Sequence, residues 1–245
     1  MGNREIIFEE KQIYHILTRA VEKRKIFFDK ADALRFIFQM CAANIGRPAL
    51  NLRRRDVVEN AESLLRGKEI SSKLIIKEYT FLVHILSFSL VVDHYHFLLV
   101  QNINGGIPKF MQKLNTGFVK YFNLKNERKG ALFESRYKAV PIKDEFQLDA
   151  VVRYINITNP LDVFQPGWRE RGLKDPKAAF EFLNHYQFSS FPDLFGKRHS
   201  RILASKDVLE EFLGKDIIRD REGGFEFVKD YLSQNKIVSF PVFLE

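Results

Sequence analysis

Two histidines, His94 and His96, are the side chains of this sequence whose type and spacing point most directly to chemistry. They stand one residue apart in the largely apolar segment 91–100, VVDHYHFLLV. If this segment is a strand, both imidazoles point to the same face, with Cα atoms roughly 6.5–7 Å apart. Two imidazoles at that separation can bind one metal ion. A lone histidine in such a place is usually a core residue, but a pair on one face favours metal binding.

Tyr154 is the candidate nucleophile. It lies in the segment 144–158, DEFQLDAVVRYINIT, where Asp144 is placed to cap a helix. Val151 and Ile155 lie near it at helical spacing, so Tyr154 can equally be a packing residue of that helix. If the helix packs on the sheet face that bears the histidines, the phenol meets the metal. A phosphodiester whose charge is neutralised by a metal is a suitable electrophile for tyrosine.

The charge of the chain predicts an anionic partner. Lys and Arg number 39 against 31 Asp and Glu, which gives a net charge of +8 and a pI near 9.4. Cations next to aromatic rings suit the phosphates and bases of unpaired DNA, although an ordinary solvated surface is the alternative for any single lysine. The side chains that we expect to contact nucleic acid are Arg19, Lys109, Lys113, Lys120, Arg136, Tyr137 and Lys138.

The composition predicts a soluble, cytoplasmic protein. Cys41 is the only cysteine, which excludes an intrachain disulfide and a cysteine-rich zinc site. The N-terminal residues MGNREIIFEEKQ lack the apolar stretch of a signal peptide. The longest apolar run, 81–92, is too short to span a bilayer, so no membrane partner is expected.

Hydrophobic periodicity and turn residues predict the elements that must position these side chains. Two apolar strands, 79–90 and 94–101, are joined by a tight connection, which predicts an antiparallel hairpin at the centre of a sheet. The complete order is strand 12–19, helix 31–43, strands 79–90 and 94–101, helix 106–127, strand 131–142 and helix 144–158. This β-α-β-β-α-β order predicts an α+β fold of the ferredoxin-like split βαβ plan, with a central antiparallel sheet. His15 and His84 then lie in neighbouring strands, in structural or supporting roles.

Two regions are predicted along the chain. Residues 1–160 carry the candidate site, and Asn159-Pro160 is expected to end the last helix of this region. Residues 46–78 are less regular and are interpreted as a surface insertion. Residues 161–245 form a mainly helical C-terminal extension. It begins with a loop over 161–176 and continues with short helices near 176–186, 206–213 and 223–234.

Four blocks of the sequence occur in the order found in the HUH single-tyrosine transposases. They are YHILTRAVEKRKIFF, VHILSFSLVVDHYHFLLV, FMQKLNTGFVKYFNLKNERKGALFESRYKAV and VVRYINITNP. Over residues 12–160 the chain resembles the REP-associated tyrosine transposases and related insertion-sequence transposases. Residues 186–196, YQFSSFPDLFG, resemble the segment that follows the catalytic domain of these proteins.

The resemblance implies a metal-dependent enzyme that cleaves and rejoins single-stranded DNA, at ends that bear hairpins. The histidine pair matches the signature that holds Mg²⁺ or Mn²⁺ in the family, and Tyr154 matches the nucleophile that forms a 5′-phosphotyrosine. Relatives take a third metal ligand one turn after this tyrosine. Thr158 is a poor ligand at that place, so the role is assigned to Asn159, with Asn156 as the alternative. The resemblance leaves a monomer and a homodimer open and implies association with a bacterial-type nucleoid.

Two other functions remain open. The first is a domesticated nucleic-acid-binding protein that keeps the fold without turnover, which the altered residues Thr158 and Asn159 would explain. The second is a metal-dependent hydrolase that uses the histidine pair and a water nucleophile. Such hydrolases usually continue into an Asp-His pair, whereas this strand continues with FLLV. Only the transposase requires Tyr154 for a covalent adduct with DNA.

Overall fold

A four-stranded antiparallel sheet forms the centre of the described part of the molecule. The computed structural model describes residues 7–47, 51–70, 80–215 and 221–233. The sheet has the order β2-β3-β1-β4, and each neighbouring pair is antiparallel. Its strands are β1 (Ile13–Arg19), β2 (Val83–Leu90), β3 (His94–Gln101) and β4 (Lys138–Pro141). This order, with helices between β1 and β2 and between β3 and β4, confirms the predicted α+β, ferredoxin-like fold.

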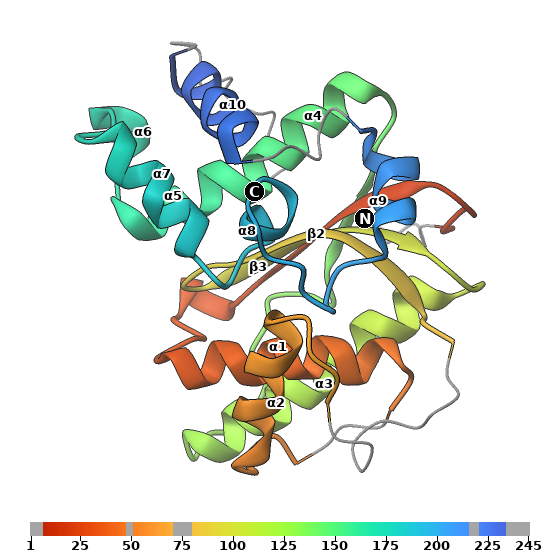
Figure 1. The fold of residues 1–245 in the computed structure, drawn as a ribbon. Coiled ribbons are helices and arrows are strands. Elements are labelled where there is room, and N and C mark those ends of the chain that lie inside the picture. Colours follow the sequence, from red (N-terminus) through yellow and green to blue (C-terminus); the bar gives the residue numbers. More distant parts are fainter. Residues whose placement is uncertain (1–6, 48–50, 71–79, 216–220, 234–245) are drawn as a thin grey trace, which may run out of the picture.

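One face of the sheet is covered by α1 (Lys30–Asn44) and α3 (Gly106–Lys125), which lie below it in Figure 1. α1 begins as predicted, because the Asp29 carboxylate accepts a hydrogen bond from the backbone N–H of Asp32. α3 turns its apolar stripe, which includes Phe110 and Phe118, into the core. A short 3-10 turn, η1 (Val21–Lys23), connects β1 to the segment before α1.

A further helix, α2 (Asp56–Leu65), packs beside α1. It lies within residues 46–78, the predicted surface insertion. Val57 and Leu64 of α2 are nevertheless buried in the same core as α1, so this part of the region contributes to the interior. Residues 48–50 and 71–78 of the region lie outside the described residues.

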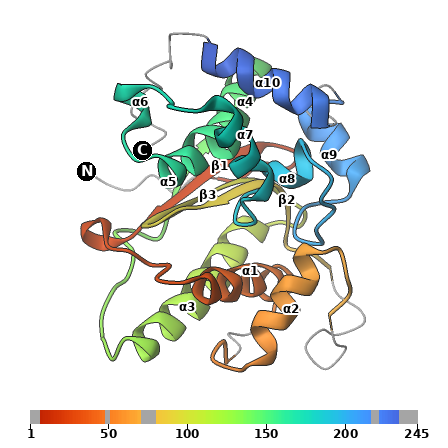
Figure 2. The ribbon, with the colours of Figure 1, turned by 60° about the vertical axis from the view of Figure 1, so that its left-hand side comes forward.

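The helices of the C-terminal half cover the other face of the sheet, as Figures 1 and 2 show. α4 (Glu145–Arg153), a π-helical segment η2 (Tyr154–Thr158) and α5 (Asn159–Phe164) follow one another without a break. The remaining helices are α6 (Trp168–Arg171), α7 (Pro176–His185), α8 (Phe191–Leu194), α9 (Lys206–Leu213) and α10 (Arg221–Ser233). The helices predicted near 176–186, 206–213 and 223–234 are thereby confirmed.

The helix that carries Tyr154 does not end at Asn159-Pro160, so this prediction was wrong. In η2 the backbone N–H of Asn159 donates to the carbonyl of Tyr154, five residues earlier, which is the π-helical pattern. Pro160 follows this wider turn, and the helix continues past it into α5 without a break. The region 161–176, predicted as a loop, contains the end of α5 and all of α6.

The predicted strand 131–142 is largely irregular. Only Lys138–Pro141 pairs with β1, and an isolated bridge joins Phe133 to Ala20 ahead of it. Between these two points, residues 134–136 are polar and exposed. Phe133 packs into the first core instead of continuing an alternating strand pattern. The apolar residues of this stretch therefore predicted a longer strand than the one that forms.

Two hydrophobic cores flank the sheet. The first lies between the sheet and α1, α2 and α3. The second contains Leu98 of β3 and Ile155 of η2 together with Trp168 and Phe191. Residues from both sides of position 160 therefore share one core, and the domain boundary drawn there stays a prediction. No helix of the described residues is both long and apolar enough to cross a bilayer.

Candidate functional site

β3 presents His94 and His96 on one face of the sheet. His96 is fully buried and His94 is half-buried, and their ring centroids are 5.0 Å apart. Leu98, two residues further along the same strand, belongs to the second core, so both imidazoles lie on the face that the C-terminal helices cover. The spacing in the sequence therefore brings the two rings together as predicted.

The Nδ1 atom of each ring has a hydrogen-bond partner. His94 Nδ1 lies 2.6 Å from Asp93 Oδ1, and His96 Nδ1 lies 2.8 Å from Nε2 of His15 on β1. Nε2 of His96 is buried and has no partner among the described atoms. A buried polar atom without a partner is costly, and metal-bound histidines commonly use their other ring nitrogen for such supporting bonds. The pair therefore fits a metal ion.

The surroundings keep the buried imidazoles neutral, which is the form that binds metals. Burial lowers the pKa of His15 to about 3. Burial, followed by the charges of neighbouring groups, of which His94 is the strongest, lowers the pKa of His96 well below its ordinary value. Burial raises the pKa of Asp93, but the hydrogen bond and the charge of His94 outweigh this effect and leave it lowered. An ionised Asp93 thus orients His94.

η2 places Tyr154 against the histidine pair. The Tyr154 ring centroid lies 5.3 Å from that of His96, with the two rings nearly perpendicular. Tyr154 is only 3% exposed, because η2 packs against β2. The helix that carries Tyr154 therefore packs on the face of the sheet that bears the histidines, which is the arrangement that the chemistry requires.

Tyr121 and Tyr137 are two other tyrosines that could be considered as the residue that bonds covalently to DNA. Both lie away from the histidine pair. Tyr121 is buried in the first core, on the opposite side of the sheet, and its hydroxyl lies 2.5 Å from Asp32 Oδ1. Tyr137 packs against the first core, with its ring centroid 6.4 Å from that of Phe8. Neither ring contacts the histidine pair.

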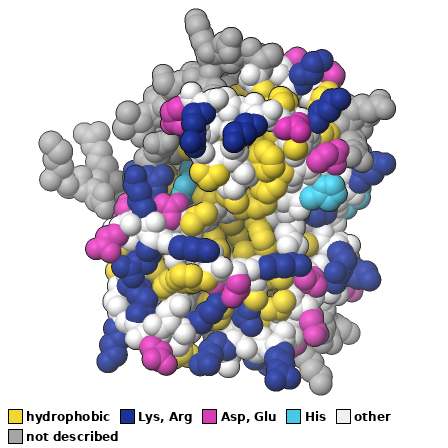
Figure 3. Space-filling view, turned by 90° about the vertical axis from the view of Figure 1, so that its left-hand side faces the viewer, with side chains coloured by type: hydrophobic (Ala, Val, Ile, Leu, Met, Phe, Trp, Pro, Cys, Tyr) yellow, Lys and Arg dark blue, Asp and Glu magenta, His cyan; other side chains and the backbone are white. Residues whose placement is uncertain are grey.

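A cavity of about 290 Å³ opens beside His94 and Tyr154. Three cations, Arg19, Lys23 and Arg169, contribute to its lining. Figure 3 views the side of the molecule where α5, α6 and α7 lie, and lysine and arginine side chains surround a band of hydrophobic residues there. The same lining includes three acidic side chains, Asp93, Asp162 and Glu170, so the cavity carries charges of both signs. Its cations are the groups that could bind a phosphate.

Asn159 is the only one of three candidate amide or hydroxyl groups after Tyr154 that lines this cavity. Its amide nitrogen lies 3.5 Å from Ser89 Oγ. Thr158 instead hydrogen-bonds to the hydroxyl of Tyr231 on α10, at 2.7 Å. Among the described residues no group of three or more His, Cys, Asp or Glu side chains could hold a metal ion. A metal on the histidine pair would therefore need an amide, water or substrate oxygen as further ligand.

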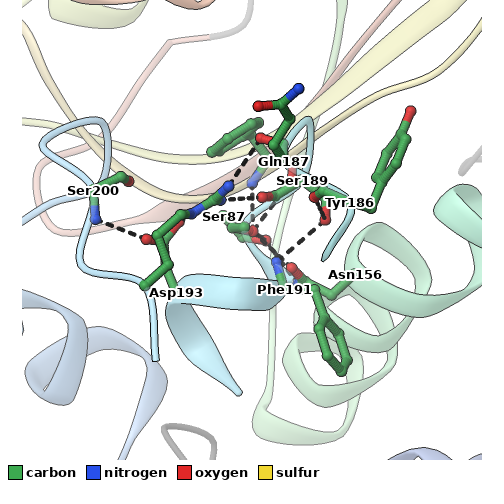
Figure 4. A network of polar contacts seen from close by, with 11 residues as sticks. Ser87, Asn156, Tyr186, Gln187, Ser189, Phe191, Asp193 and Ser200 are labelled. Carbon is green, nitrogen blue, oxygen red and sulfur yellow. Dashed lines mark hydrogen bonds and ion pairs between the residues drawn. The ribbon is translucent and has the colours of Figure 1, made fainter. Parts of the chain in front are cut away.

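Asn156, the alternative ligand, takes part in a buried network of hydrogen bonds (Figure 4). Its amide nitrogen donates to Ser87 Oγ at 2.9 Å and to the carbonyl of Val152 at 2.8 Å. Its amide oxygen accepts a hydrogen bond from Ser190 Oγ at 2.7 Å, and the two serine hydroxyls are 2.8 Å apart. This closed ring ties η2 to β2 and to the segment before α8. Both amide atoms of Asn156 thus face this network, and Asn156 does not line the cavity beside His94.

The residues predicted to bind DNA do not all lie near the cavity. Arg19 lines it, next to His94 on the neighbouring strand. The three lysines of α3, Lys109, Lys113 and Lys120, lie on the helix that covers the opposite face of the sheet. They are solvent-accessible, but the fold does not bring them to the histidine pair.

The predicted cluster at Arg136, Tyr137 and Lys138 lies at the edge of the sheet. Arg136 is exposed just before β4. Lys138 pairs with Leu17, which pairs in turn with His96, so Lys138 is on the same face as the histidines, two strands away. The DNA contacts of these residues and of the α3 lysines stay predictions.

Two residues of the site, Arg169 and Asp162, have no signal in the sequence. Arg169 reaches Tyr154 from an element distant in the chain, and Asp162 forms an ion pair with Arg169. His15, predicted to lie in a neighbouring strand in a structural or supporting role, hydrogen-bonds to His96. Arg169 and Asp162 fall in the stretch interpreted as a loop, where an isolated arginine and aspartate are unremarkable. Asp93, by contrast, directly precedes His94, and this adjacency could have suggested a supporting carboxylate.

A match to a protein family agrees with the sequence resemblance. Residues 50–158 match the family model described as "Transposase IS200 like". Among solved structures, one described as a REP-associated tyrosine transposase bound to a REP hairpin is similar, with 13% sequence identity and a TM-score of 0.46, over 79% of this chain and 85% of the other. No curated protein matches the chain. The family match contains both histidines and Tyr154 but ends one residue before Asn159.

Proposed function

Through residues 50–158 the chain belongs to the IS200-like transposases, the HUH single-tyrosine family, and on this premise we propose that it cleaves and rejoins single-stranded DNA through Tyr154. The observation that carries the proposal is the contact between Tyr154 and His96, whose Nε2 is buried without a partner among the described atoms. A nucleophile and a metal-binding pair thus meet on one face of the sheet.

The proposed reaction is a transesterification. The Tyr154 Oη, after losing its proton, forms a bond to phosphorus, and the bond to the 3′ oxygen breaks. The products are a 5′-phosphotyrosine and a strand that ends in a 3′-hydroxyl. Attack by a 3′-hydroxyl on the phosphotyrosine reverses the step and joins the strands. The phosphotyrosine conserves the energy of the phosphodiester, so the cycle needs no nucleotide cofactor.

His94 and His96 would hold Mg²⁺ or Mn²⁺, with Asp93 and His15 fixing the ring orientation of each. The metal would neutralise charge on the non-bridging oxygens of the scissile phosphate. Imidazole is a poor match for Mg²⁺, which prefers oxygen ligands, so Mn²⁺ should serve at least as well. Arg19 and Lys23, in the wall of the cavity, would bind the phosphate backbone.

Asn159 is our proposed third ligand, and η2 supports this assignment. In an α-helix the residue one turn after Tyr154 would be Thr158, whose hydroxyl bonds to Tyr231. The π-helical turn takes in one more residue, which puts Asn159 one turn after Tyr154 and on the wall of the cavity. The extra residue between the tyrosine and the Asn-Pro pair is thus compatible with an amide ligand.

Hairpin recognition and the choice between monomer and homodimer remain proposals that rest on the family resemblance. We expect the substrate to be a single strand that carries a hairpin next to the cleavage position. The remaining DNA-binding predictions, on α3 and before β4, concern the flanking strand, because these residues lie outside the cavity.

Covalent capture tests the proposed function. The full chain is incubated with Mn²⁺ and a labelled single-stranded hairpin oligonucleotide, and a protein–DNA band that resists denaturant is expected. Tyr154→Phe should abolish this band, because the nucleophilic oxygen is gone, whereas Tyr121→Phe, which alters a tyrosine of the first core, should retain it. Peptide mapping of the adduct should identify residue 154.

Two outcomes would contradict the proposal and point to the alternatives. Tight binding of the hairpin without any covalent band, in Mn²⁺ or Mg²⁺, would indicate a nucleic-acid-binding protein of the same fold. Cleavage that survives in Tyr154→Phe would indicate a water nucleophile and therefore a hydrolase.

A further inference from the structure

The face of the Tyr154 ring carries a cation from the C-terminal extension. The central guanidinium carbon of Arg169 lies 5.6 Å from the centre of the ring. Arg169 belongs to α6, eleven residues beyond the end of the family match at residue 158. The edge-on contact with His96 restrains the same ring from another direction. The nucleophile is therefore held between a member of the histidine pair and a residue that the family match does not include.

An acidic side chain holds this guanidinium in place. Asp162 on α5 accepts hydrogen bonds from Nε of Arg169, at 3.1 Å, and from one of its terminal nitrogens, so the pair is bidentate. The same carboxylate accepts a bond from Nε1 of the buried Trp168, at 2.9 Å. α5 continues directly from η2, so the chain runs from Tyr154 through Asp162 and folds back over the tyrosine at α6.

We propose that Arg169 is a positioning residue for Tyr154, locked in place by Asp162, and that the C-terminal extension thereby completes the active site. The proposal rests on the proposed function, because it concerns the orientation of the Tyr154 phenol that attacks the DNA phosphate. A planar guanidinium can stack on a ring and bind a carboxylate with two parallel bonds at once, which a lysine ammonium cannot do.

The electrostatics agree with this geometry. Burial lowers the pKa of Arg169, but the hydrogen bond and charge of Asp162, together with the charge of Tyr154 and a hydrogen bond to it, outweigh this effect and raise it. Arg169 also belongs to the cavity lining, next to His94 and Asn159. The guanidinium thus stays charged where the phenol must meet the DNA phosphate.

The key variant is Arg169→Lys, which retains the charge but removes the planar fork. Arg171→Lys is the matched control, because Arg171 lies on the same short helix and, among the described residues, its side chain donates hydrogen bonds to the backbone carbonyls of Pro166 and Gly167. Asp162→Asn is the second variant, since it keeps the shape of the anchor and removes its charge. Thermal unfolding of all three establishes that each is folded.

The first readout separates binding from the covalent step. At saturating hairpin DNA with Mn²⁺, Arg169→Lys should lower the single-turnover rate of adduct formation by about ten- to a hundredfold. The dissociation constant for the DNA should change little, because the charge is retained. Asp162→Asn should act in the same direction, and the loss in the double variant should be smaller than the product of the two single losses. Arg171→Lys should match the wild-type rate.

The second readout needs no activity. Fluorotyrosine is incorporated into the full chain, and the ¹⁹F resonance that disappears in Tyr154→Phe is assigned to residue 154. This resonance should shift or broaden in Arg169→Lys and in Asp162→Asn, but not in Arg171→Lys. If the wild type forms no adduct yet the resonance responds in this way, the proposed function fails while the contact between Arg169 and the tyrosine stands.

The proposal is overturned if Arg169→Lys is folded and forms adduct at the wild-type rate, or if the Tyr154 resonance does not respond to it. It is also overturned if Arg171→Lys loses as much rate as Arg169→Lys, because the effect would then belong to the folding of α6. A loss confined to DNA affinity would assign Arg169 to phosphate binding and would likewise reject the positioning role.

Discussion

Burial decides the protonation state of several single side chains in this protein. His15 and His96 illustrate this, because both are buried and both have lowered pKa values. A hydrogen bond joins their rings. A neutral His96 that donates from Nδ1 to His15 keeps the lone pair on Nε2 for a metal. Burial also favours the neutral form of Cys41, the one cysteine of the chain, but for a thiol this raises the pKa.

Cys41 should react slowly with alkylating reagents in the native protein. Burial raises the pKa of its thiol to about 11, above the ordinary thiol value of about 8.5. Because the thiolate is the reactive form, the native rate with iodoacetamide at pH 8 should be about a hundredfold below the rate in urea. The measurement is mass spectrometry of the alkylated fraction against time.

The pH profile is the control for this prediction. The native rate should keep rising about tenfold per pH unit beyond pH 9, where the rate of the unfolded chain levels off as its thiol becomes fully ionised. A native rate that levels off near pH 9 would show an ordinary thiol pKa, and the low reactivity would then reflect poor access alone.

η2 is the element on which the site depends most. Its π-helical turn carries Tyr154 at one end and delivers Asn159 to the cavity at the other. Its middle is fastened by the Asn156 network, in which Ser190 of the C-terminal extension completes the hydrogen bonds. The proline after Asn159 is accommodated because the wider turn precedes it, and a π-helical turn in a helix is frequently a sign of function.

Removal of Thr158 should be tolerated better than loss of Asn159. The deletion places the asparagine four residues after Tyr154, so an ordinary α-helical turn would bring it to the same side as η2 does. We expect the folded deletion variant to form the covalent DNA adduct within about tenfold of the wild-type rate, whereas Asn159→Ala should lose about a hundredfold or more. Single-turnover adduct assays in Mn²⁺ provide the measurement.

Thr158→Ala is the control for the deletion, because it removes the hydrogen bond to Tyr231 without changing the helical register. If the deletion variant is folded by circular dichroism but is as inactive as Tyr154→Phe, then the π-helical turn itself is required. In that case our explanation of the extra residue is wrong.

The molecule as a whole is a sheet between two cores, and the second core is completed by residues far along the chain. Trp168, Phe180, Phe191 and Phe195 join side chains of β2, β3 and η2 there. Backbone bonds strengthen the connection, since Leu90 donates to the carbonyl of Phe188 and Ser190 donates to that of Phe88. The C-terminal extension therefore supports the site directly.

Phe191→Ala should destabilise the whole chain. Phe191 is fully buried in the second core, so its removal should lower the free energy of unfolding by about 3–5 kcal/mol. Phe146→Ala is the matched control, because Phe146 is 80% exposed and its loss should change the free energy by less than about 0.5 kcal/mol. Urea unfolding followed by circular dichroism measures both.

A loss below about 1 kcal/mol in Phe191→Ala would contradict a shared core, because a fully buried phenylalanine leaves a large cavity. A transition in two steps, with only one step shifted, would show that the extension unfolds separately from the sheet and would favour the domain boundary predicted at residue 160.

Local rules in the sequence determined β1, β2 and β3, the cap of α1 by Asp29 and the common face of His94 and His96, because alternation and capping act over neighbouring residues. Only the tertiary structure decided that His15 supports His96, that η2 delivers Asn159 past a threonine, and that Arg169 reaches Tyr154 from beyond the matched family region. The contacts of His15 and Arg169 join residues far apart in the chain, and the place of Asn159 depends on one π-helical turn. Neither can be predicted from the pattern of neighbouring residues.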